Sequence, residues 1–196
     1  MLKEALSKYH IILGSGSPRR QQFFKDLGLD FEVRLKPVEE VFPKRLKHSE
    51  ISDYLAQLKA IPFKDTLKDN DILITSDTIV WHNDEALGKP KDTDEAFQML
   101  KTLSDTTHEV ISSVCFTSAK HQKTVNTITK VTFKALSDDE INYYISTFKP
   151  FDKAGAYGIQ EWIGLIGVIY LEGSYFNVMG MPTYLVYQTL ESLIDK

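Results

Sequence analysis

The sequence predicts an α/β protein whose mixed, partly antiparallel central sheet is flanked by helices. Two patterns support this prediction. Near the N-terminus, a short apolar run at residues 10–13 leads through a glycine-rich turn into a helical pattern, and a longer run at residues 71–80 has the character of a central strand. Further along, residues 109–119 and 124–135 alternate in polarity on either side of the polar turn 120–123, which predicts a β-hairpin.

The size of the chain limits how it can be organised. It has 196 residues, of which 42% are hydrophobic and 26% are charged. These fractions are ordinary for a globular protein, and the length is sufficient to bury a substantial core. It suits one large domain or two small lobes that share a sheet. We expect residues 1–196 to form a single domain.

Two helices in the first third of the chain have recognisable starts. Ser17 fits the N-cap, Pro18 the first helical position and Gly28 the stop of a helix over about residues 19–27. Ser49 can cap a second helix, because an apolar face follows it at helical spacing. The members of that face are Ile51, Tyr54, Leu55 and Leu58.

Three further helices are predicted later in the chain. Residues 93–103 begin with two acidic side chains, and the helix dipole favours negative charge in the first turn. Ser137 and Glu140 form the capping-box pattern at the start of another helix. A last helix follows Pro182 and runs to about residue 194.

Composition argues against several classes of protein. The net charge is −4 and no long basic run occurs, which argues against nucleic acid as a partner. No apolar stretch reaches the roughly 20 residues that a membrane helix needs, and residues 1–9 lack the apolar core of a signal peptide. The only cysteine, Cys115, is expected to be a buried strand residue. Because one cysteine cannot form a disulfide within the chain, we expect a cytoplasmic protein.

Residues 14–20 form a candidate phosphate site. Here a strand leads through Gly-Ser-Gly-Ser-Pro to a helix start that carries Arg19 and Arg20. Free backbone N–H groups and the helix dipole favour an anion at such a start, and guanidinium groups match phosphate oxygens. No Gly-Lys-Ser/Thr follows, so the segment is not a Walker A loop. Taken alone, it is equally well explained as a capped helix start with two surface arginines.

Carboxylates are the candidate catalytic and metal-binding groups. Asp77 lies beside Thr78 in an otherwise apolar strand, where a carboxylate is costly unless it is paired or binds a cation. It can activate a water molecule, or simply bond to the backbone. Glu40, in the loop, follows another glutamate and supplies the oxygen ligands that hard cations need. Acidic pairs in loops are usually only solvated, so both interpretations of Glu40 stay open.

Three polar residues elsewhere are candidates for contacts to a nucleotide. Lys59 flanks the apolar face of its helix, and Lys89 lies in a Gly-Lys-Pro turn. Lone lysines are mostly surface residues. Gln160 ends the glycine-rich segment 152–160, and its amide combines donors with an acceptor, as recognition of a base edge requires. The alternative for this segment is a structural turn.

Taken together, these pieces resemble the Maf family of nucleotide pyrophosphatases. The matching segments occur in family order over nearly the whole chain, at residues 15–20, 55–60, 76–80, 88–90, 152–160 and 173–182. The resemblance implies a Maf/ITPase-like fold with two lobes around a cleft, often in a homodimer. It also implies hydrolysis of a nucleoside triphosphate to its monophosphate and pyrophosphate, with a divalent metal cation, Mg²⁺ or Mn²⁺, as cofactor.

The resemblance further implies roles for individual residues. Asp77 is the catalytic base, and Glu40 and Asp77 lie at the metal. The substrate contacts are Ser15, Arg19, Arg20, Lys59, Thr78, Lys89 and Gln160. Within the family, the sequence is similar to the branch that acts on dTTP and UTP. The sequence departs from the family at two positions. Gly14 stands where alanine is common. Glu161 stands where the family usually has glycine, and it adds a charge near the expected base pocket.

The predicted reaction is in-line attack of water on the α-phosphorus, with Asp77 orienting or deprotonating that water. Metal, arginine and lysine stabilise the leaving pyrophosphate. Two other functions stay open. One is a regulatory protein that binds nucleotide or nucleic acid without hydrolysis, and the other is a hydrolase of altered purine triphosphates. Modified pyrimidine triphosphates fit the same pocket as dTTP or UTP.

Overall fold

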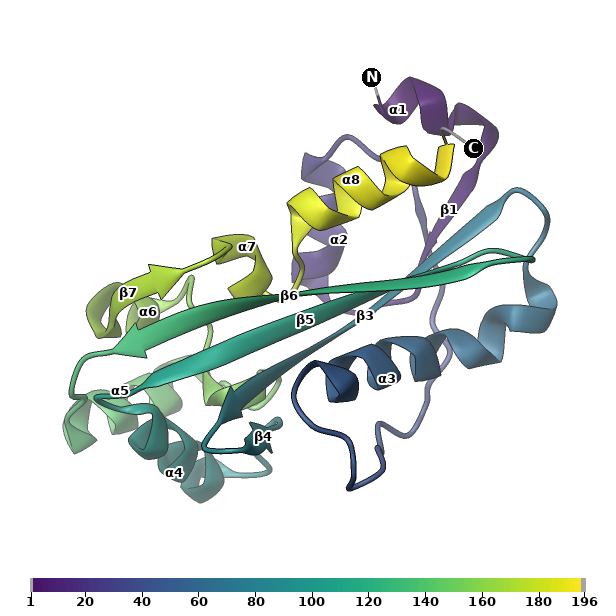
Figure 1. Cartoon of the computed structure of the whole chain (residues 1–196). Helices are drawn as coiled ribbons and strands as arrows, with labels where there is room; N and C mark the ends of the chain where they lie inside the picture. Colours follow the sequence, from purple (N-terminus) through teal and green to yellow (C-terminus); the bar gives the residue numbers. More distant parts are fainter. Residues whose placement is uncertain (1, 195–196) are drawn as a thin grey trace. The chain divides into compact units, whose positions relative to one another are not determined.

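Seven strands form one mixed sheet in the computed structural model, which describes residues 2–194 (Figure 1). The strands are β1 (His10–Leu13), β2 (Glu32–Val33), β3 (Asp71–His82), β4 (Glu85–Leu87), β5 (Thr107–Thr117), β6 (Gln122–Phe133) and β7 (Val168–Glu172). Their order is β2-β1-β3-β5-β6-β7, with β4 paired to β3. β1 is parallel to β2 and β3, whereas β4 and β7 are antiparallel to their neighbours. The predicted mixed sheet is confirmed.

Helices connect most of these strands. The α-helices are α1 (Leu2–Ala5), α2 (Pro18–Asp26), α3 (Ser49–Ala60), α4 (Thr93–Leu103), α5 (Asp138–Phe148), α6 (Trp162–Gly167), α7 (Tyr175–Val178) and α8 (Thr183–Ile194). Short 3-10 helices are η1 (Leu6–Lys8), η2 (Ile61–Thr66) and η3 (Ala154–Ala156). The α/β class predicted from the alternation of strands and helices is therefore confirmed.

The chain divides into two compact units. Unit 1 consists of Met1–Asp77, Ser112–Thr127 and Gly180–Lys196, and unit 2 consists of Thr78–Ile111 and Ile128–Met179. The long strands β3, β5 and β6 each contribute residues to both units. Each unit also has an apolar core of its own.

In unit 1, α3 and η2 pack against buried strand residues. Their apolar contacts are made by Ile12, Ala56, Ala60, Phe63, Leu73 and Cys115. Polar strand side chains that face this helix are satisfied locally, because Thr75 Oγ1 donates to the Ala56 carbonyl at 2.7 Å and Ser113 Oγ donates to Ser52 Oγ at 2.7 Å. Cys115 is a free, buried cysteine, which confirms its predicted place in a strand.

In unit 2, α4, α5 and α6 pack around strand residues from β5 and β6. The fully buried members of this core include Leu100, Leu103, Val131, Phe133, Ile141, Tyr144 and Ile163. The predicted hairpin is present with both strands displaced toward the N-terminus, 107–117 and 122–133 rather than 109–119 and 124–135. The displacement follows from the turn, since the Ser118 N–H donates to the His121 carbonyl at 2.8 Å and so ends β5 early.

Three of the predicted helix ends are confirmed. Ser17 accepts a hydrogen bond from the Arg20 N–H at the start of α2, and Pro18 is the first helical residue. Gly28, just past the helix, has φ of 70°, a left-handed conformation that glycine adopts without strain. The reciprocal capping box of Ser137 and Glu140 is present at the start of α5.

The predicted cap at Ser49 is wrong. Ser49 is the first residue of α3, and the preceding His48 has φ of 53° and makes no side-chain cap bond. The chain turns one residue earlier than predicted, because the N–H of Ile51 already donates to the His48 carbonyl at 3.1 Å. The Glu50 carboxylate accepts the Lys47 N–H at 3.0 Å, so a glutamate side chain serves this helix start.

Candidate active site

The turn between β1 and α2 is held by Ser15, a buried residue of unit 1. The Ser17 N–H donates to Ser15 Oγ at 3.3 Å, and Gln21 Nε2 donates to the Ser15 carbonyl at 3.3 Å. These bonds fix the turn directly ahead of the N-terminus of α2, where backbone N–H groups and the helix dipole favour an anion. Ser15 therefore lies in the turn directly ahead of α2, and its role as a substrate contact stays a prediction.

Arg20 connects α2 to two backbone carbonyls of the same unit. Its Nη1 donates to the Ser76 carbonyl at 2.7 Å, and its Nε donates to the Gly180 carbonyl at 3.0 Å. Burial lowers the pKa of Arg20, the charge of Arg19 lowers it further, and the charges of Asp77 and Glu40 oppose the decrease. Since an arginine keeps its charge in proteins, Arg20 is a cation fixed beside the carboxylates of the site.

Lys59, Asp77 and Glu40 form the central cluster of unit 1. Lys59 Nζ in α3 lies 2.6 Å from Asp77 Oδ1 in β3 and 3.2 Å from Glu40 Oε1 in the loop that precedes α3. The side chain of Asp77 is only 7% exposed and that of Lys59 16%, so the buried carboxylate is compensated by the ammonium. Asp77 was predicted to be paired or to bind a cation, and in the structure it forms an ion pair with Lys59.

The same cluster contains the carboxylates that are available to a metal ion. Within residues 2–194, no group of three or more His, Cys, Asp and Glu side chains has a metal-binding arrangement. Asp77 and Glu40 nevertheless already surround one positive charge, the Lys59 ammonium. Mg²⁺ is commonly held by one or two carboxylates together with substrate phosphates. This pair fits such a site if phosphate oxygens complete it.

In unit 2, three of the segments singled out by sequence meet at Gly155. The Gly155 N–H donates to the Gly88 carbonyl at 3.0 Å, which ties segment 152–160 to the turn that carries Lys89. A Cβ on Gly155 would lie 2.8 Å from Val80 Cγ2, and its φ of 65° is left-handed. Only glycine therefore allows this close approach to β3.

The structure thus divides the predicted site residues into two groups. Unit 1 contains Ser15, Arg19, Arg20, Glu40, Lys59 and Asp77, and unit 2 contains Thr78, Lys89 and Gln160. Direct contacts are present within the first group, where Lys59 joins Asp77 to Glu40.

The family described as Maf-like protein matches residues 10–193. The chain belongs to the Maf family. It is 62% identical over 194 residues to the dTTP/UTP pyrophosphatase of Flavobacterium johnsoniae, covering 99% of this chain and 100% of that protein. The dTTP/UTP pyrophosphatase of Christiangramia forsetii is 56% identical over 195 residues, with complete coverage of both chains.

Among solved structures, the Staphylococcus aureus Ham1 protein shares the fold of this Maf protein. The TM-score is 0.55 at 17% identity, and the match covers 94% of this chain and 99% of the other. None of the helices of this Maf protein within residues 2–194 is long and apolar enough to cross a bilayer.

Sequence reasoning missed two residues of the Maf protein that bind Glu161, the residue after Gln160. Tyr144, assigned only to an apolar helix face, donates its hydroxyl hydrogen to Glu161. Lys153 lies in the glycine-rich segment and is buried against Glu161 and Asp152, at 3.2 and 2.7 Å. The Asp-Lys dipeptide was visible in the sequence, but nothing in the local pattern indicated the role of the tyrosine hydroxyl.

Proposed function

We propose that this Maf protein hydrolyses dTTP and UTP to the monophosphate and pyrophosphate. The observation that carries the proposal is the cluster in which Lys59 holds two carboxylates, Asp77 and Glu40, with the fixed cation Arg20 nearby. Such a cluster combines groups that activate water or bind a cation with groups that attract phosphate. The activity in the names of relatives at 62% and 56% identity supports the same reaction.

In the proposed mechanism, Asp77 accepts a proton from, or orients, the water that attacks the α-phosphorus. Asp77 and Glu40 would hold the divalent cation, Mg²⁺ or Mn²⁺, which polarises phosphate oxygens and neutralises charge on the leaving pyrophosphate. Arg20 and Lys59 add positive charge for the same purpose. Ser15 fixes the turn before the helix start, and Lys89 is a further phosphate contact.

The preference for pyrimidines is assigned to Arg19, Thr78 and Gln160. Gln160 can donate to and accept from a base edge. Modified pyrimidine triphosphates present similar edges and are included among the candidate substrates. We further propose that the protein works in the cytoplasm, which its buried free thiol, Cys115, suits.

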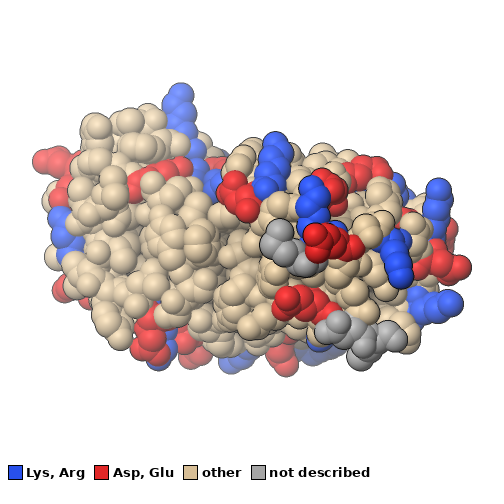
Figure 2. Space-filling model, turned by 90° about the horizontal axis from the view of Figure 1, so that it is seen from above, with Lys and Arg blue, Asp and Glu red and all other residues tan. Residues whose placement is uncertain are grey.

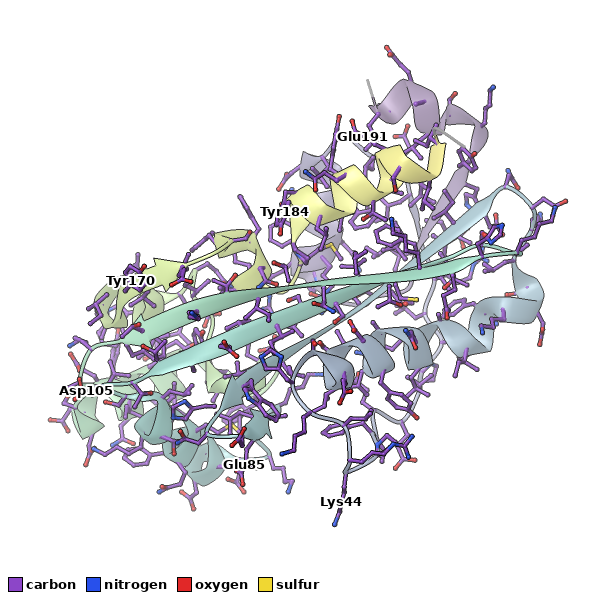
Figure 3. All side chains as sticks on the ribbon, viewed as in Figure 1. Lys44, Glu85, Asp105, Tyr170, Tyr184 and Glu191 are labelled. Atoms are coloured by element: carbon purple, nitrogen blue, oxygen red, sulfur yellow. The ribbon has the colours of Figure 1, made fainter. Side chains whose placement is uncertain are left out.

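We propose in addition that the protein is a homodimer. β7 ends the strand order, so within residues 2–194 no strand pairs with its outer edge, and its Ile169 and Tyr170 are 65% and 58% exposed. Leu165, Tyr175 and Phe176 on α6 and α7 are also exposed, Leu165 by 81%. Figure 2 shows a largely uncharged surface over β7 and α7, and Figure 3 labels Tyr170 there. The one charged residue of β7, Glu172, is paired with Lys130 of β6. The rest of the strand can therefore meet a second copy of itself across a two-fold axis without like-charge repulsion.

The reaction is tested by measuring pyrophosphate release from canonical and modified nucleoside triphosphates with Mg²⁺ or Mn²⁺. We expect release from dTTP and UTP, and a loss of at least about 100-fold in Asp77→Asn with nucleotide binding retained. Asp69→Asn, an exposed acid ahead of β3, is the matched control and should leave turnover unchanged.

Three other outcomes would each contradict a different part of the proposed function. Near-normal turnover in Asp77→Asn would remove Asp77 as the base. A preference for altered purine triphosphates would replace the pyrimidine assignment. If the wild type releases no pyrophosphate with either metal, the chain is instead a binding protein, and salt-sensitive DNA binding would then identify nucleic acid as its ligand.

A further inference from the structure

Glu161 occupies the position directly after Gln160, at the start of α6. Residues at this N-cap position commonly accept a hydrogen bond from the helix N-terminus. Glu161 makes no such bond, and its side chain is only 19% exposed. The Glu161 carboxylate therefore binds other groups than the N-terminus of α6.

Two buried side chains hold that carboxylate. The Tyr144 hydroxyl of α5 donates to Glu161 Oε2, and Lys153 Nζ lies 3.2 Å from Glu161 Oε1. Burial, and then the hydrogen bond to Glu161, hold the pKa of Tyr144 well above its usual value, so its hydroxyl keeps the proton that it donates. Lys153 is 8% exposed and also contacts Asp152, so its ammonium is compensated by two carboxylates.

These contacts close segment 153–161 into a ring. Lys153 and Glu161 stand at its two ends, and the Gly158 N–H in its middle donates to the Tyr144 hydroxyl at 3.0 Å. The ion pair passes directly over Gly158, because a Cβ there would lie 3.0 Å from Glu161 Cδ and 3.1 Å from Lys153 Cε. The backbone on both sides of Gln160 is thus fixed by side chains that are themselves buried.

We infer that Glu161 is a positioning residue that, through Tyr144 and Lys153, fixes the backbone of Gln160 and so sharpens the selection of the nucleotide base. The inference rests on the proposed function, in which Gln160 contacts the base. Glu161 stands where the family resemblance places glycine. A glycine at that position could make neither the hydrogen bond with Tyr144 nor the ion pair with Lys153. The Glu161 carboxylate is bound to Tyr144 and Lys153, and in this inference it acts through them on the backbone rather than on the substrate.

The test compares Glu161→Gly, Glu161→Gln and Tyr144→Phe with wild type, using dTTP, UTP, dGTP and ITP with Mg²⁺. We expect KM for dTTP to rise about tenfold in Glu161→Gly and Tyr144→Phe, with kcat within twofold, because the loss affects base binding and leaves Asp77 unchanged. The preference for dTTP over dGTP should fall in parallel. Glu161→Gln keeps an acceptor for the Tyr144 hydroxyl and should recover part of the loss.

Glu140→Gln is the matched control. It removes another ion pair of unit 2, Lys134 Nζ to Glu140 Oε1 at 2.6 Å, while glutamine still serves the capping box. We expect its KM and selectivity to equal those of wild type. If Glu161→Gly has wild-type KM and selectivity while wild type hydrolyses dTTP, the positioning role is wrong and the proposed function stands.

Amide hydrogen exchange over residues 153–161 separates the two hypotheses when no turnover is found. Faster exchange at Gly158 and Glu161 in Glu161→Gly, but not in Glu140→Gln, supports the tie independently of activity. Unchanged exchange overturns it. Absence of turnover in wild type overturns only the proposed reaction, because the exchange experiment still decides whether Glu161 fixes the segment.

Discussion

His108 is a buried histidine of unit 2 that the proposed reaction does not use. Its Nε2 lies 2.7 Å from the Tyr157 hydroxyl, its ring packs beside Phe133, and its Nδ1 has no hydrogen-bond partner among the described residues. Burial, with a smaller contribution from His82, lowers the pKa of His108 to about 3. The folded protein therefore holds it neutral. In the unfolded chain a histidine titrates near 6.5, so the stability that depends on neutral His108 is complete above that pH and is lost below it.

We expect the His108 contribution to lower the free energy of unfolding by roughly 2 kcal/mol between pH 7 and pH 5. His108→Gln keeps a hydrogen-bonding partner for Tyr157 but cannot titrate, so its stability should change less over this range. Urea unfolding of both proteins at the two pH values measures the difference. An equal loss in wild type and variant would show that His108 is already protonated, or accessible to protons, in the fold.

At the scale of elements, the start of α5 is the best-defined helix end. Ser137 Oγ accepts the Glu140 N–H at 3.1 Å, and Glu140 Oε2 accepts the Ser137 N–H at 2.9 Å. The hydrogen bond from Lys134, followed by that from the Ser137 backbone, lowers the pKa of Glu140. The carboxylate is thus ionised at neutral pH and suited to a helix N-terminus.

Ser137→Ala should lower the free energy of unfolding by about 1 kcal/mol, because it removes a cap and leaves a backbone N–H of the first turn unsatisfied. Ser146→Ala, in the exposed face of the same helix, is the control. It should be neutral or slightly stabilising, since alanine is the better helix former. Chemical unfolding of the three proteins checks this, and equal stabilities would show that the capping box contributes nothing measurable.

At the scale of the whole molecule, the exposed edge at β7 predicts assembly. Light scattering should give twice the chain mass of 22.4 kDa for wild type. Tyr170→Lys places a charge on the edge and should shift the protein to the monomer, because like charges then meet across a two-fold axis. Lys44→Ala, on a loop of unit 1 labelled in Figure 3, is the control and should stay dimeric. A monomeric wild type at micromolar concentration would remove the dimer proposal.

Most of the local structure can be predicted from short sequence patterns. The ends of α2, α5 and β1, the hairpin of β5 and β6 and the burial of Cys115 depend on patterns a few residues long, such as a cap, a turn glycine or alternating polarity. The family followed from six such segments in order. Ser49 is the exception. Short patterns could not distinguish Ser49 from His48 as the N-cap of α3, because the backbone conformation of His48 determines where the helix begins. The expectation of one domain over residues 1–196 stays a prediction.

Which of these residues touch depends on long-range contacts of the folded chain. Lys59 and Asp77 are 18 residues apart in sequence, and their ion pair depends on α3 lying against β3. Arg20 is committed to carbonyls at positions 76 and 180, which no local pattern indicates. Packing at Gly14 also depends on a distant residue. Alanine is common at this position in the family, but here a Cβ would lie 2.8 Å from Thr75 Cγ2. Such contacts join distant parts of the chain, and burial and side-chain direction fix them only after folding has brought those parts together.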